Sequence, residues 1–228
     1  MRYGVTGLAF ACMVFSAPAL AAQSACNETV HLAVEPADKA PQVAAVLRRR
    51  LAGEGASVEA EGAGLRVGLP AGVDDALLTR PARIEFRLVA EKATGAVAMS
   101  RWQGQGSESV EPQIILDESH LRDLTAKADP NIADAARNGA VDFHLDPHAI
   151  KNLMAASTEA IGRKLAILVD DKIVVDPIIR APIASATGEI SGGFSAASAA
   201  ELVKLLPSGR LPARVVIASR EAAPCANH

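Results

Sequence analysis

Apolar residues in the first third of the chain follow two different periods. The apolar run at residues 30–34 and the alternating segment 82–89 predict β-strands, and shorter strands are expected at 57–60 and 65–69. After the first strand, apolar residues recur three and four positions apart, which predicts a helix whose inner face carries Val43, Val46, Leu47 and Leu51. Strands and helices interleave, so this part is expected to form an α+β or split β-α-β unit.

A second unit with the same mixture of periods begins near Ile114. Apolar and polar residues alternate over 141–145 and predict a half-buried strand. The Asp146-Pro147 pair that follows supplies a helix N-cap and a proline for the first helical position. The apolar face of this helix is expected to carry Ile150, Leu153, Met154 and Ile161.

The last third of the chain predicts a hairpin, a strand and a helix. Apolar residues at 165–169 and 173–175 flank Asp170-Asp171-Lys172, which is typical of a β-hairpin. A Gly-rich strand region is expected at 188–193, after which Ser195 can cap a helix bearing Leu202, Leu205 and Leu206. A final strand is expected at 215–218. Residues 93–113 lose periodicity and are expected to form a linker or an exposed excursion; the lone Trp102 there can serve either as a contact residue or in packing.

The composition favours an exported globular protein. Half of the 228 residues are hydrophobic, 3% are aromatic and the net charge is −3. This mild acidity does not suit a phosphate backbone, so we expect no nucleic-acid partner. Arg2, an apolar run over 7–15 and small residues up to Ala21 predict a signal peptide at 1–21 and a periplasmic location. A membrane anchor is the alternative, but the run is shorter than the roughly 20 residues that span a bilayer, so no stable membrane insertion is expected.

The cysteines change the picture at the two ends of the chain. Cys12 lies in the predicted signal peptide, so processing leaves Cys26 and Cys225. Export and an even count favour a disulfide between them, which the chain-entropy argument values at about 5 kcal/mol for so long a loop. Two free thiols, or lipidation at Cys26, are the alternatives.

Residue types with catalytic or ligand-binding chemistry occur, but their spacing does not bring them together. Asp142, His144, Asp146 and His148 are metal-ligand types that straddle a strand-to-helix junction, so a solvated edge is favoured over a metal site. No Gly-x-Ser-x-Gly nucleophile motif and no phosphate-binding Gly-Lys-Ser/Thr motif is present. We therefore expect no catalytic residue, no metal and no cofactor, and a protein that is not an enzyme.

Several motifs resemble a known family. The segments 162–177, 188–195 and 205–212 are similar, in the same order, to the head subdomain of SecD, a protein-translocation factor. The segments 46–50, 65–70 and 84–89 resemble its base subdomain, so the resemblance covers about residues 30–220. The family residues expected to have structural roles are Asp170, Pro177, Gly188, Gly192, Gly209 and Pro212.

The resemblance implies an α+β fold in which a ferredoxin-like base carries an inserted α+β head. The base would comprise 22–92 and 213–228, the linker 93–113 and the head 114–212. The pairing of Cys26 with Cys225 would then staple the open ends of the base.

The resemblance also implies a function in protein export. Family members capture chains that emerge from the secretion channel, so we expect a periplasmic, non-enzymatic module that binds exported or unfolded polypeptides or secretion-channel components. The family's proton-conducting helices have no counterpart in this sequence, so the chain is not expected to drive translocation by itself. A regulatory or structural envelope protein that binds one partner or a small ligand is the alternative.

The departures from the family pattern fall on the head hairpin. Asp170-Asp171 stands where the family usually has Asp-Gly, and Val175-Asp176 replaces small residues. Asp accepts a positive φ less readily than Gly, so some strain is expected in the turn. The candidate partner-contact residues are Asp171, Asp176 and Phe194.

Overall fold

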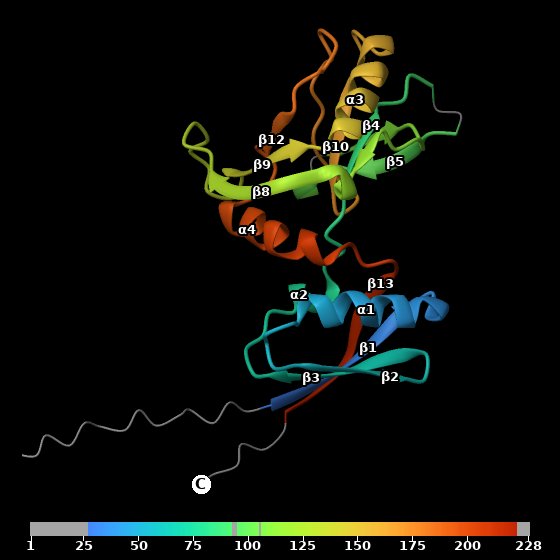
Figure 1. Cartoon of the computed structure of the whole chain (residues 1–228), viewed down its shortest axis with the longest axis vertical. Helices are drawn as coiled ribbons and strands as arrows, with labels where there is room; N and C mark the ends of the chain where they lie inside the picture. The colour runs from blue at the N-terminus through green and yellow to red at the C-terminus, as the bar shows by residue number, and fades with distance from the viewer. Residues whose placement is uncertain (1–26, 93–94, 105, 223–228) are drawn as a thin grey trace, which may run out of the picture.

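The computed structural model describes residues 27–92, 95–104 and 106–222. They form two units, a lower base and an upper head, as Figure 1 shows. The predicted signal peptide and the cysteines Cys12, Cys26 and Cys225 lie outside the described residues.

The base is ferredoxin-like, as predicted. Its four antiparallel strands follow the order β13-β1-β3-β2, where β1 is Asn27–Glu35, β2 Ser57–Glu61, β3 Gly64–Pro70 and β13 Arg214–Ala222. Helices α1 (Ala40–Arg50) and α2 (Ala76–Thr79) lie on one side of this sheet (Figure 1). Every second residue of β1 and β3 points toward α1, which places Val30, Leu32, Leu65 and Val67 in one core with Val43 and Leu47.

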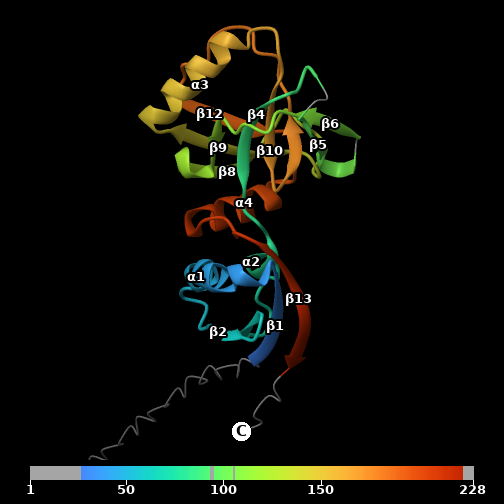
Figure 2. The same cartoon turned by 90° about the vertical axis from the view of Figure 1, so that its right-hand side faces the viewer.

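The head is inserted between α2 and β13. One of its sheets has the order β11-β10-β4-β7, formed by Lys172–Val175, Leu165–Val169, Ile84–Leu88 and Leu116–Asp117. Another has the order β12-β9-β8, formed by Thr187–Ser191, Gly139–Leu145 and Leu121–Ala128. The hairpin β5-β6 (Val97–Ser100 and Ser107–Val110), with the 3₁₀ turn η2 (Trp102–Gly104) in its connection, lies at the side of the head, where β5 and η2 contact β11 (Figure 2). The longer helices are α3 (Pro147–Glu159) and α4 (Ala196–Leu205).

Two segments belong to a different part of the molecule from the one predicted. The strand expected at 82–89 was assigned to the base, but β4 pairs with β10, with Phe86 opposite Ile167. The expected linker 93–113 contains β5 and β6, and Val110 is buried against Ala166 and Leu168 of the head. Alternation predicts that a segment is a strand, but the partner strand depends on packing that a single sequence does not reveal.

The helix caps were predicted correctly, but one helix face was not. Asp146 accepts a hydrogen bond from the Ala149 N–H at 2.8 Å, and Ser195 accepts one from the Ser198 N–H at 3.2 Å. On α3, however, Met154 is 43% exposed and the nearby Ile161 is 54% exposed. The buried stripe of α3 is narrower than expected and consists of Ala149, Leu153 and Ser157.

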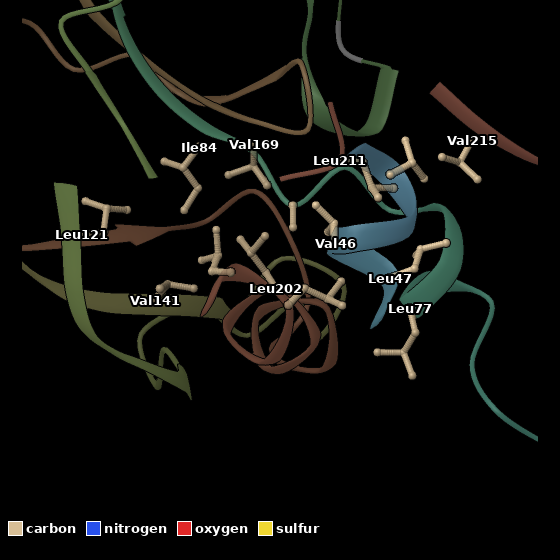
Figure 3. Close-up of a cluster of buried hydrophobic side chains, with 14 of the residues drawn as sticks. Val46, Leu47, Leu77, Ile84, Leu121, Val141, Val169, Leu202, Leu211 and Val215 are labelled. Carbon is tan, nitrogen blue, oxygen red and sulfur yellow. The ribbon is translucent and has the colours of Figure 1, made fainter. Parts of the chain in front are cut away.

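Base and head share a continuous apolar core. Figure 3 shows Leu202 of α4 between the head residues Val141 and Val169 and the base residues Val46 and Leu47. The chain passes between base and head twice, once through the segment that contains Pro81 and once through the segment that contains Leu211. These two connecting segments contact each other, because the Leu211 N–H donates to the Pro81 carbonyl at 3.0 Å.

The side chain of Arg50, at the end of α1, forms hydrogen bonds with both connecting segments. It is 6% exposed and its guanidinium donates to the carbonyl oxygens of Arg80, Pro81 and Gly209 at 2.6, 3.1 and 3.2 Å. Burial lowers the pKa of Arg50 to about 10, which leaves it charged at neutral pH. The orientation of the head on the base is therefore stabilised by hydrogen bonds from the Arg50 side chain to main-chain carbonyls as well as by apolar contacts.

Candidate functional site

A cavity of about 640 Å³ lies where two sheets of the head meet. One wall is β11 with the residues after it, and the other is β12 with the glycines after it. The segments β5-η2 and 129–138 contribute the remaining side chains. The cavity, which we call the head cleft, is lined by Arg101, Trp102, Arg137, Ile173, Val174, Val175, Asp176, Pro177, Glu189, Ser191, Gly192 and Gly193.

The floor of the head cleft depends on a glycine. A Cβ atom on Gly193 would lie 2.3 Å from Cγ1 of Val174, so only glycine allows these two segments to approach so closely. Strands β11 and β12 are both edge strands of their sheets. The head cleft therefore lies between two sheet edges.

Trp102 forms an aromatic side of the head cleft. Its ring packs edge to face on Phe194, with ring centroids 6.1 Å apart and an interplanar angle of 72°. The Lys172 ammonium lies 5.4 Å from the Trp102 ring centroid. Phe194 was predicted to contact a partner, but it is 1% exposed, so this prediction is wrong. Phe194 instead supports Trp102, which can reach a ligand.

Asp176 anchors the β5-η2 segment to the hairpin. Both oxygens of its carboxylate accept hydrogen bonds from Arg101 at 2.9 Å, and Lys164 donates to one of them at 2.8 Å. Glu108 completes the network by pairing with Arg101 and Lys164. The Arg101 guanidinium, followed by the Lys164 ammonium, holds the pKa of Asp176 well below its usual range. The Asp176 carboxylate thus accepts hydrogen bonds from within the protein, and it positions Arg101 and the adjacent Trp102.

The β10-β11 turn contains two aspartates with left-handed backbones, with φ of 50° at Asp170 and 62° at Asp171. The Asp170 carboxylate, which is 11% exposed, accepts hydrogen bonds from the Arg83 N–H at 3.0 Å and from Arg80 Nε at 2.8 Å. The exposed Asp171 pairs with Arg83 at 2.9 Å. Asp170 therefore ties the hairpin to the connection between base and head, and Asp171 lies at the surface.

The glycines among the family-motif residues allow backbone conformations or close contacts that a side chain would hinder. Gly192 and Gly209 have φ of 88° and 86°, a region that favours glycine. A Cβ atom on Gly188 would lie 2.4 Å from the Phe143 ring. Pro177 lines the head cleft, and Pro212 is exposed on the segment that returns to the base.

The four residues with metal-ligand chemistry have separate partners. Asp142 pairs with Lys127 at 2.7 Å, and His144 lies 3.6 Å from Asp123. Asp146 caps α3 and contacts His120 at 3.1 Å, and His148 Nε2 lies 3.1 Å from the side-chain amide nitrogen of Asn152. Among residues 27–92, 95–104 and 106–222, no group of three or more metal-ligand side chains converges. In the same ranges no helix is both long and apolar enough to cross a bilayer.

Sequence reasoning did not identify Arg101 and Arg137 as residues of the site. Both lie in stretches without clear periodicity. The signal that was available is the combination of an unusual Asp176 with basic residues near the lone Trp102, since a half-buried carboxylate needs a cationic partner.

Comparisons with known proteins match the head and most of the chain. The family described as "SecDF, P1 head subdomain" matches residues 95–213. The protein translocase subunit SecD of Acetobacter pasteurianus is 30% identical over 186 residues, which cover 74% of this chain and 35% of that protein. SecD of Rickettsia bellii is 32% identical over 151 residues, covering 62% of this chain and 28% of the relative. The chain thus spans about a third of the length of these curated relatives.

Solved structures share the fold. One described as "Structure and function of a membrane component SecDF that enhances protein export" superposes with a TM-score of 0.63 at 21% identity, covering 84% of this chain and 98% of that chain. Another, described as "Crystal structure of SecDF in Super-membrane-facing form", has a TM-score of 0.65 at 20% identity and covers 90% of this chain and 32% of the other.

Proposed function

The chain belongs to the SecDF family, and on that premise we propose that it is a periplasmic module that binds exported polypeptides through the head cleft. The coarser role, a periplasmic domain related to protein export, follows from the family. The binding of polypeptide itself is the step that we add.

The observation that supports the proposal is the composition of the head cleft. Its volume of about 640 Å³ lies in the range of ligand-binding cavities. Its walls combine the side chains of Trp102 and two valines with the main chain of Gly192 and Gly193, which no side chain of these residues covers. Such a surface offers apolar contact and hydrogen bonds without demanding one side-chain sequence. A protein that meets many exported chains needs this kind of tolerance.

Charge points the same way. Arg101 and Asp176 neutralise each other, and Glu189 is paired with Lys127 at 2.8 Å. Arg137 is exposed at the cleft, and its Nε donates to the Gly192 carbonyl at 3.3 Å. The charged residues that line the cleft are two arginines, Asp176 and Glu189, so their formal charges cancel. The head cleft therefore has little net charge, which suits polypeptides of varied sequence better than a single highly charged ligand.

The test is photo-crosslinking in living cells from a probe that replaces Ser191, compared with a probe that replaces the exposed Ala60 of the base. Capture of many different exported chains, or of secretion-channel subunits, from Ser191 alone supports the proposal. Capture of one unrelated envelope protein indicates instead a structural or regulatory role outside export. Equal capture from both positions contradicts a role for the head cleft.

A further inference from the structure

The free edge of β12 carries unpaired main-chain groups, and the pattern of its pairing with β9 shows which ones. The Leu145 N–H donates to the Ala186 carbonyl at 2.8 Å, and the Gly192 N–H donates to the Gly139 carbonyl at 3.4 Å. The register runs from Thr187 opposite His144 to Ser191 opposite Ala140. In an antiparallel pair, hydrogen-bonded positions alternate with positions whose groups point away from the partner.

The outward-pointing positions of β12 are therefore 187, 189 and 191. Thr187 is already satisfied, because its N–H and its carbonyl both bond to the Ser185 hydroxyl, at 3.1 and 2.7 Å. Glu189 and Ser191 are left, and within the described part of the chain no strand pairs with this edge. Both residues line the head cleft, and their N–H and carbonyl groups lie on the side of β12 that faces away from β9.

The opposite wall is less available to a ligand backbone. Strand β11 already forms a parallel bridge at Ile173 with Arg101, which Asp176 holds in place through two hydrogen bonds. A chain that enters the head cleft thus meets one free sheet edge, that of β12. Facing this edge, it meets the side chains of Trp102 and Val174.

We propose that the head cleft binds its ligand as an added β-strand, an extended polypeptide segment that hydrogen-bonds to Glu189 and Ser191 along the free edge of β12. This inference rests on the proposed function and specifies the form of the substrate. Strand addition takes its affinity from main-chain hydrogen bonds and its selectivity from alternate side chains. The preferred segment has small or β-branched residues facing Trp102 and no proline at the paired positions.

The first test uses the full mature protein and a fluorescent, end-capped octapeptide of alternating valine and threonine residues. Two further peptides carry N-methyl groups on all the valines or on all the threonines. Strand addition predicts that one methylated peptide loses at least tenfold in affinity and that the other stays within about twofold of the parent, because only every second N–H faces β12. Equal affinity of all three peptides would overturn the proposal.

A matched pair of variants tests the protein side. Ser191→Pro removes an N–H that β9 does not use, and should weaken octapeptide binding about tenfold. Ser191→Ala keeps the N–H and removes only the hydroxyl, so it should weaken octapeptide binding much less than Ser191→Pro does. An equal loss in both variants would contradict strand addition. If Ser191→Pro melts at a clearly lower temperature than Ser191→Ala, the methylated peptides decide with the unaltered protein.

The outcomes separate the two proposals. Cellular crosslinks at Ser191 without octapeptide binding would overturn strand addition and leave the proposed function standing. Absence of both would overturn both.

Discussion

Asp176→Asn tests whether the charge network positions the β5-η2 segment. The substitution keeps the size of the side chain but removes the charge that Arg101 and Lys164 share. The substituted side chain would have one amide oxygen and one NH₂ group in place of two carboxylate oxygens. The NH₂ group cannot accept a hydrogen bond from Arg101, so one of the two bonds is lost, and the neutral amide oxygen accepts the other more weakly.

The size of the effect follows from the geometry. Hydrogen bonds to charged groups contribute roughly 1.5–3 kcal/mol each when buried. The Asp176 side chain is 17% exposed and that of Arg101 is 27% exposed, so solvent screening reduces this value. We expect Asp176→Asn to lower the free energy of unfolding by about 2 kcal/mol at pH 7.

The pH dependence gives a sharper signature. The folded-state pKa of Asp176 lies below its unfolded value of roughly 4, so its contribution is complete above about pH 5 and declines as the pH falls through the acid range. Urea unfolding of both proteins at pH 7 and at pH 3 should therefore show a smaller difference at pH 3. No difference at pH 7, or a difference that does not shrink with acid, would refute the reasoning.

Three other changes probe the junction, the turn and the termini. Arg50→Met should lower the free energy of unfolding by about 3 kcal/mol, because it leaves partly buried carbonyl groups without their donor. Calorimetry measures this loss, and an unchanged melting temperature would contradict it. Asp171→Gly should be neutral or stabilising by up to about 1 kcal/mol in urea unfolding, since it relieves a positive φ, whereas Asp170→Gly should destabilise; equal effects would exclude the proposed division of roles. Mass spectrometry of the mature protein should show Cys26 and Cys225 joined, two hydrogens lighter than the reduced form, and free thiols would remove the staple.

The sequence predicted elements well where local chemistry decides them. The caps Asp146 and Ser195 and the turn at Asp170 are set by residues within a few positions, so they could be placed from the sequence. The partner of β4 could not, because its alternating pattern suits any half-buried sheet.

The candidate site was only partly predictable for the same reason. Phe194 was expected to contact a partner, yet its ring is buried and packs against Trp102, a contact between residues more than ninety positions apart that the local sequence does not show. The free edge of β12 emerges only from the register with β9, which joins residues more than forty positions apart.

The base has its two ends on neighbouring antiparallel strands, with Glu28 opposite Ala222 and Glu35 opposite Arg214. A pulling force applied to the two ends would therefore load the hydrogen bonds between β1 and β13 one after another, as in opening a zip, and not all together. A force applied between the head and these ends would instead reach the base across the crossings at Pro81 and Leu211 and load many bonds at once. The base should therefore yield more easily to a force between its two ends than to a force between its ends and the head.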